Sequence, residues 1–276
     1  MLILPQMGEF LVQHNLGTVG ATAVGTNVTT GASTTTKGTP AELIASTDFE
    51  TYFVEVFATD YGASAVASGG CMDILVGSAT EEILIPDLLF GNCGGVAANL
   101  MKRWMFPLYI PAGTRIACQA AGERNNQIFN VGICLYGGNG LPPFKTGSKV
   151  TTYGIGTIPA AVAVTPGASG VEGSWTEITA STSEDHHALY PSLHIPGDTA
   201  FVSRVYFLDI GIGAATEEEI AQSYIYVATA AEIISGPTFK TLPCFKNIPA
   251  GSRLTARLST DSTALDTPQV AIHAVS

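Results

Sequence analysis

The chain has 276 residues, of which 46% are hydrophobic and 13% are charged, and its formal net charge is −11. The hydrophobic residues suffice for a packed core, while the charged share is about half the usual one, so uncharged polar residues must cover much of the surface. With 12 Lys and Arg against 23 acidic residues and no basic run, we expect no direct contact with nucleic acid or an anionic membrane. Such a surface favours contact with other proteins, although a plain soluble β protein tolerates the same composition.

Targeting signals and reactive cysteines are not evident in the sequence. Residues 1–6 carry no positive charge and start no sustained apolar run, so we expect no secretory signal. No apolar stretch approaches the ~20 residues of a membrane helix. The five cysteines show neither C-x-x-C pairs nor metal-ligand spacing, so we expect them to be reduced. Cys118 and Cys134 are expected on neighbouring strands but on opposite faces.

Four segments have the residue pattern of β-strands. In chain order they are residues 51–57, 129–136, 202–212 and 269–275, which are rich in β-branched and aromatic residues or alternate with period two. Turn-forming clusters at 122–126 and 259–262 separate such segments. The acidic clusters Glu81-Glu82 and Glu217–Glu219 are expected at hairpin tips. Many short strands with regular turns indicate a sandwich or a barrel.

The sequence contains an internal duplication. Four blocks recur in the same order, and each second copy follows its first by 135 to 138 residues. The matched blocks are 28–33 with 164–169, 42–47 with 177–182, 73–82 with 209–218, and 110–116 with 248–254. The glycine- and proline-rich residues 137–143 resemble a linker. We therefore predict an all-β protein of two tandem, homologous β-sandwich domains (jelly-roll or Ig-like), residues 1–140 and 141–276.

The repeated I-P-A-G segment predicts a β-turn in each half. Proline presets φ at the second position of such a turn and glycine suits the fourth, and the turn then starts a strand. Ile116 and Cys118 should face the core in that strand, while the repeated arginine before them faces outward. The turn residues are Pro111, Gly113, Pro249 and Gly251, and the repeated arginines are Arg115 and Arg253.

Candidate chemistry is sparse. His186 and His187 adjoin two acidic residues, but neighbours on a strand face opposite sides, so we interpret the segment as exposed and polar rather than metal-binding. Asp73 and Asp209 recur, as do Arg115 and Arg253. They could form a functional pair used twice, but we favour a salt bridge or strand-end hydrogen bond within each domain. The acidic turns lack the ligand spacing of calcium loops. We predict no catalytic residue, cofactor or metal.

The two tryptophans, Trp104 and Trp175, lie at different places in the two halves. Tryptophan is favoured at interface hot spots, so both residues are candidates for contacts between the halves or with a partner. Core filling is the alternative.

Three blocks carry a resemblance to a known group of proteins: W-T-E-I-T-A-S-T (175–182), L-D-I-G-I-G-A-A-T-E-E (208–218) and I-P-A-G-S-R-L (248–254). The chain resembles uncharacterised virion structural proteins of tailed bacteriophages, and the first half carries the same blocks in looser form. The resemblance implies a β-sandwich protein of the particle, such as a head decoration, a collar spike or a tail accessory. It implies no catalytic residue.

We therefore predict a non-enzymatic virion component, assembled in the host bacterial cytoplasm, that forms homo-oligomers and contacts other virion proteins. One sandwich would dock on the particle while the other projects. The rival prediction is a module that binds a receptor or a host surface glycan, which requires exposed Trp or Tyr residues grouped on one edge. A depolymerase would need paired carboxylates that face one cleft.

Overall fold

The computed structural model is all-β, with no helix among the residues it describes, and it confirms the predicted fold class. The structure describes residues 10–17, 25–60, 69–77, 80–90, 102–138, 145–195, 204–213, 217–228, 233–235, 240–241, 244–262 and 267–276. The expected linker between the halves lies mostly outside these residues. Within them, no helix is long and apolar enough to cross a membrane.

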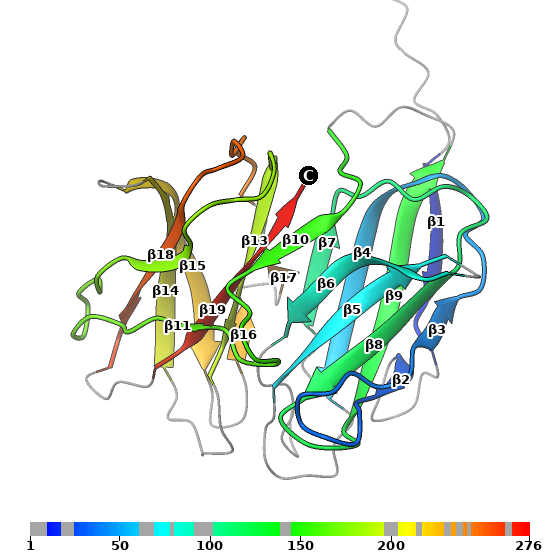
Figure 1. The fold of residues 1–276 in the computed structure, drawn as a ribbon, viewed down its shortest axis with the longest axis horizontal. Helices are drawn as coiled ribbons and strands as arrows, with labels where there is room; N and C mark the ends of the chain where they lie inside the picture. The colour runs from blue at the N-terminus through cyan, green and yellow to red at the C-terminus, as the bar shows by residue number, and fades with distance from the viewer. Residues whose placement is uncertain are drawn as a thin grey trace, which may run out of the picture.

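The first half is a sandwich of two antiparallel sheets (Figure 1). One sheet has the order β1 (Phe10–Asn15), β9 (Ile128–Gly138), β4 (Thr51–Asp60) and β7 (Lys102–Phe106), with β2 (Thr26–Thr29) beside β1 on the same edge of β9. The other sheet has the order β3 (Ala41–Ile44), β8 (Ile116–Gly122), β5 (Gly70–Val76) and β6 (Glu82–Leu89).

The second half repeats this scheme of strand pairing. Its first sheet places β10 (Val150–Tyr153) and β11 (Val162–Ala163) on one edge of β19 (Gln269–Val275) and β13 (Ala188–His194) on the other. Its second sheet has the order β12 (Thr176–Thr179), β18 (Leu254–Thr260), β14 (Arg204–Ile212), β15 (Glu218–Ala228) and β16 (Ile233–Ser235). In each half the chain crosses between sheets as in a jelly roll.

The four segments expected to be strands all form strands: β4, β9, β14 and β19. The acidic cluster Glu81-Glu82 lies at the β5–β6 hairpin, as expected, and Glu217 directly precedes β15. The expected adjacency of Cys118 and Cys134 is wrong, because β8 and β9 belong to opposite sheets. Cys118 is fully buried in the core, and Cys134 lies half-buried opposite Glu55 of β4.

The two halves pack side by side and share part of one core (Figure 1). The buried cluster of the first half includes four residues of the second: Val150, Ala188, Tyr190 and Val275. All seven residues of β13 are buried, because one face of this strand covers its own core and the other faces the first half. Each half therefore buries apolar side chains against the other half as well as in its own core.

Backbone pairing also joins the halves. β17 (Lys240–Thr241), from the second half, pairs in parallel with β7 of the first. Just beyond it, Cys244 forms a bridge with Leu189 of β13, which ties this segment to the second half. Gly147 exchanges hydrogen bonds with Pro107 and Tyr109 on the other side of the junction. These backbone contacts hold the two sandwiches side by side (Figure 1).

Polar side chains complete the junction between the halves. His273 is fully buried, with its Nδ1 2.9 Å from Thr152 Oγ1 and its Nε2 3.0 Å from Ser192 Oγ. The backbone N–H of Leu89, in β6, points at the same Nε2 from 3.4 Å. His194, also buried, has its Nε2 3.1 Å from a carboxylate oxygen of Glu123. The junction thus buries two histidines whose partners include groups of the first half.

Candidate contact surface

The repeated arginines form the same ion-pair triad in both halves. Arg115 pairs with Glu42 and Glu81, and Arg253 pairs with Glu177 and Glu217. Each triad links three separate strands or hairpins on the outer face of a sheet. All six residues lie within the duplicated blocks. Hydrogen bonds to these glutamates raise the pKa of Arg115 and of Arg253. The repeated arginines therefore contact repeated glutamates, and none of these contacts is with Asp73 or Asp209.

The repeated aspartates lie opposite position-matched residues of the neighbouring strand. Asp73 of β5 faces Gln119 of β8, whose side-chain amide donates to it at 2.7 Å. Asp209 of β14 faces Arg257 of β18, whose Nε lies 3.0 Å away. The aspartate and the residue opposite it have the same positions in both halves. Only in the second half is the opposite residue a cation, Arg257 of β18. Both aspartates are buried and serve the sheet itself.

In the first half, Lys37 supplies the missing positive charge. Its Nζ lies 2.7 Å from Asp73 and 2.5 Å from Asp87. Although burial lowers the pKa of Lys37, the hydrogen bonds to Asp73 and Asp87 outweigh this effect and raise it. A lysine from the loop before β3 therefore takes the place that Arg257 holds in the other half. Neither Lys37 nor Arg257 was identified from the sequence, because neither lies in a duplicated block.

The repeated I-P-A-G turns have the expected form. Gly113 has φ +79° and Gly251 has φ +81°, a region that favours glycine. A buried threonine holds each turn: Thr47 Oγ1 donates to the carbonyl of Pro111, and Thr182 Oγ1 donates to that of Pro249. The same hydroxyls accept backbone N–H groups from Thr114 and Ser252 at 3.0 Å.

Replacing Thr47 with valine is expected to lower the free energy of unfolding by about 1–3 kcal/mol, because the Pro111 carbonyl and the Thr114 N–H lose their partner. Thr182→Val should have an effect of similar size. Urea denaturation measures both changes. Ser46→Ala, at an exposed neighbouring position, is the control and should change stability by under about 0.5 kcal/mol. Equal effects of the threonine and serine substitutions would contradict this role.

The two tryptophans occupy different environments. Trp104, in β7, is 2% exposed and belongs to the buried cluster that includes residues of both halves. Trp175 is half-buried and lies over the guanidinium of Arg257, with 4.4 Å from the Arg257 Cζ to the ring centroid. Its ring also covers Gly211, where a Cβ would come within 3.0 Å of it. Trp175, with the surrounding carboxylates, thus lies on the outer sheet face of the second half.

The expectation that His186 and His187 form an exposed polar segment is wrong. They are 2% and 6% exposed. His186 Nε2 lies 2.8 Å from the hydroxyl of Tyr153, and burial lowers the pKa of both histidines. The described residues contain no group of three or more His, Cys, Asp or Glu side chains that could hold a metal. Four cysteines are free thiols: Cys71, Cys118, Cys134 and Cys244.

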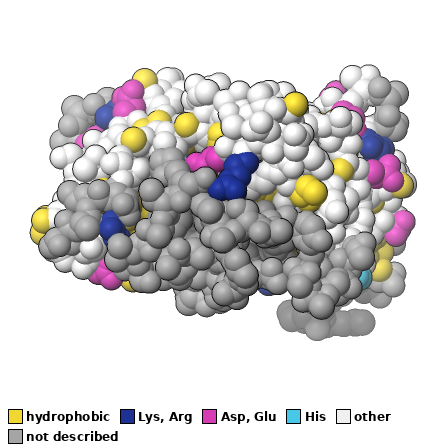
Figure 2. Space-filling model, turned by 90° about the horizontal axis from the view of Figure 1, so that it is seen from below, with side chains coloured by type: hydrophobic (Ala, Val, Ile, Leu, Met, Phe, Trp, Pro, Cys, Tyr) yellow, Lys and Arg dark blue, Asp and Glu magenta, His cyan; other side chains and the backbone are white. Residues whose placement is uncertain are grey.

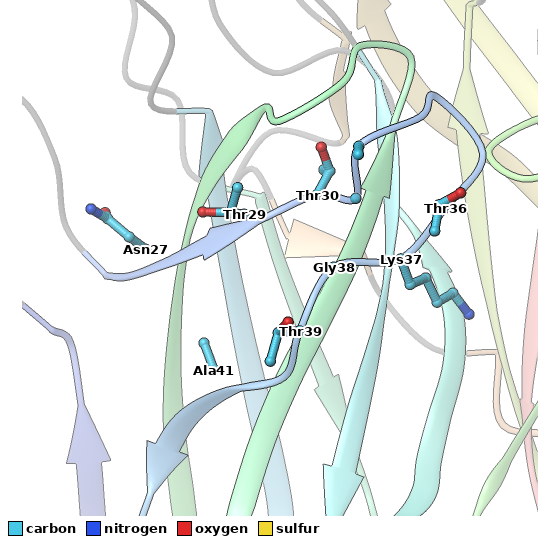
Figure 3. A pocket seen from close by; sticks show the side chains of 10 residues that line it. Asn27, Thr29, Thr30, Thr36, Lys37, Gly38, Thr39 and Ala41 are labelled. Carbon is cyan, nitrogen blue, oxygen red and sulfur yellow. The ribbon is translucent and has the colours of Figure 1, made fainter.

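A polar pocket of about 520 Å³ lies between β2, the following loop and β3 (Figure 3). Its walls are rich in hydroxyl groups, including those of Thr29 and Thr39. Among the residues that line it, Lys37 alone is charged, and its ammonium group is engaged by Asp73 and Asp87. Figure 3 shows the Lys37 side chain extending away from Thr29 and Ala41. The pocket therefore offers neutral hydrogen-bonding groups.

Several of the charged residues visible in Figure 2 lie next to a residue of opposite charge, while others stand alone. This arrangement agrees with the ion pairs described above.

Neither a protein-family model nor a curated protein matches the chain. Among solved structures, PNGF-II is similar with a TM-score of 0.37 and 11% identity over 96% of this chain and 65% of that chain. The tandem CBM22 domains of Paenibacillus barcinonensis Xyn10C give 0.28 and 10% over 95% and 91%. The structure of infectious bursal disease virus Gx strain gives 0.28 and 10% over 97% and 71%. The chain thus spans just under two thirds of PNGF-II, and these likenesses concern the β-sandwich fold alone.

Proposed function

We propose that the chain is a non-enzymatic structural component of a tailed-bacteriophage particle. It is exposed on the particle as a head decoration, a collar spike or a tail accessory, and it acts through protein–protein contact. The observation that carries this proposal is the core shared between the two jelly rolls, which makes them one stiff block. A stiff block is suited to a structural position, because contact with its neighbours costs it less conformational entropy than it would cost two sandwiches on a flexible linker.

The duplicated residues support the same proposal. The arginine triads, the aspartate pairs and the threonine-held turns all stabilise the sandwich that contains them. What the duplication preserved is therefore the architecture of each sandwich. The remaining surface is polar and poor in charge. Burying such a surface against another protein has a small desolvation cost.

Open sheet edges offer one means of contact. Among the described strands, β3 and β12 each pair with one neighbour only, β8 and β18 respectively. An unpaired edge presents N–H and C=O groups that another chain can pair with. We propose that homo-oligomers and contacts with other virion proteins use these edges.

Rebinding to particles tests the proposal. Tailed particles made without the chain should take up the purified protein at a fixed number of copies per particle. Light scattering should show a mass above that of the 28.6 kDa monomer. A protein that stays monomeric and does not bind such particles would contradict the proposal.

A further inference from the structure

Two tyrosines, the exposed Tyr109 and the half-buried Tyr52, lie together at one end of the first sandwich. The rings of Tyr52 and Tyr109 have centroids 6.0 Å apart and are inclined by 32°. Both hydroxyls donate to one carboxylate: Tyr52 to Glu50 Oε2 at 3.0 Å and Tyr109 to Glu50 Oε1 at 3.3 Å. We call Glu50, Tyr52 and Tyr109 the aromatic patch. Tyr109 is 38% exposed.

The backbone beneath the aromatic patch is fixed on both sides. Thr51 and Ile110 exchange two hydrogen bonds, of 2.9 and 3.0 Å, between the segments that carry the two tyrosines. The carbonyl of Glu50 accepts the N–H of Gly138, and the N–H of Tyr109 donates to Gly147. The rings are therefore held in place before any ligand arrives, which reduces the entropy cost of binding.

Glu50 has no cationic partner within 4 Å in the described part of the chain, in contrast to Glu42, Glu81, Glu177 and Glu217, which all pair with arginine. Its negative charge is held by two phenol groups instead. Desolvation and the nearby Glu50 raise the pKa of both tyrosines, so both hydroxyls remain donors at neutral pH. The carboxylate keeps lone pairs that can accept further hydrogen bonds.

The second half shows that the fold does not require this arrangement. The bridge between Thr51 and Ile110 corresponds to the bridge between His186 and Ile248, which aligns Glu50, Tyr52 and Tyr109 with Asp185, His187 and Asn247. There Asp185 accepts the backbone N–H of Ala250 at 2.7 Å, and His187 is buried. The second half thus has no pair of aromatic residues around a carboxylate at these positions.

We propose that the aromatic patch is a binding site for neutral, pyranose-containing carbohydrate. The C–H face of a sugar ring packs on tyrosine, while sugar hydroxyls donate to the Glu50 carboxylate, so apolar and polar contacts lie side by side. Glu50 and the net charge of −11 disfavour sialic and uronic acids. This inference goes beyond the structural role proposed above and does not depend on it.

A glycan array with neutral and anionic oligosaccharides, followed by calorimetric titration of the bound glycans, tests the proposal on the full chain. Neutral glycans should bind, and Tyr109→Ala should weaken binding by about tenfold or more, as truncation of a central aromatic contact commonly does. Tyr109→Phe, which keeps the ring, should weaken it less. Glu50→Gln should weaken it while the thermal unfolding midpoint stays close to that of the parent.

Phe245→Ala is the matched control, since Phe245 is an aromatic residue that is 65% exposed in the other half. This variant should bind glycan as the parent chain does. The proposal is overturned if no neutral glycan binds, if anionic glycans bind in preference, or if Tyr109→Ala and Phe245→Ala change affinity equally. None of these results bears on whether the chain binds to particles, so the two proposals fail separately.

Discussion

Tyr190→Ala is expected to lower the free energy of unfolding by about 3–5 kcal/mol, the range for removing a large aromatic side chain from a core. Tyr190 is fully buried, and its ring lies 4.5 Å, centroid to centroid, from that of Phe106 in the other half. Its hydroxyl donates to the carbonyl of Met105. The substitution therefore removes packing and a hydrogen bond at the junction between the halves.

The two tryptophans allow each half to be followed separately. In Trp175→Phe the fluorescence reports Trp104 in the first half, and in Trp104→Phe it reports Trp175 in the second. Because the halves share a core, we expect the fluorescence transition of each single-tryptophan variant to coincide with the urea transition of the same variant followed by circular dichroism. Tyr190→Ala should shift both transitions. Tyr190→Phe, which loses only the hydroxyl, should cost about 1–3 kcal/mol. A shift of the second-half transition alone would show that the halves unfold independently.

Mild acid is expected to destabilise the protein through His273. Burial lowers the pKa of His273 to about 3, from an unfolded value near 6.5. The folded state therefore binds fewer protons than the unfolded state between these values, and stability is lost as the pH falls below 6.5. At roughly 1.4 kcal/mol per pH unit, the loss between pH 6.5 and pH 5 is about 2 kcal/mol from this residue.

Urea titrations at pH 7, 6 and 5 measure this dependence. His273→Gln should be less stable than the parent at pH 7, because the contacts with Thr152 and Ser192 change, but its stability should depend less on pH. Burial lowers the pKa of His186 and His187 as well, so some pH dependence remains in the variant. An unchanged slope in His273→Gln would refute the assignment.

The carboxylates of Glu184 and Glu217 affect the stability of the protein in a lower pH range. Although burial opposes it, hydrogen bonds from Thr151 and Lys149 lower the pKa of Glu184, and the Arg253 contact lowers that of Glu217. Their contribution to stability is present above the unfolded pKa of about 4.3 and is lost as the pH falls further. Losses between pH 6.5 and pH 5 therefore report the histidines.

The sequence was informative where local pattern decides structure. Period-two alternation identified residues 129–136 and 269–275 as strands, and proline with glycine identified the turns at Pro111 and Pro249. The duplicated blocks also contained the partners of the repeated arginines, Glu42 with Glu81 and Glu177 with Glu217. These pairs could have been matched by position alone.

The contacts between the halves could not be predicted in this way. β13 reads A-L-Y-P-S-L-H, and the face with its tyrosine and histidine covers the first half, although nothing in this local pattern distinguishes that face from one in contact with solvent. A strand with polar residues on one face has the same local sequence pattern whether that face lies against solvent or against another domain. Likewise, Tyr52 and Tyr109 lie far apart in sequence, and only the Thr51–Ile110 bridge brings them together.

Electron cryomicroscopy of the assembled particle shows whether the chain lies on its exterior and how the two sandwiches are arranged. We expect density on the exterior of a tailed particle that fits both jelly rolls side by side as one rigid body, in repeated copies that contact neighbouring proteins. Particles that lack such density, or density in which the two sandwiches stand apart, would contradict this expectation.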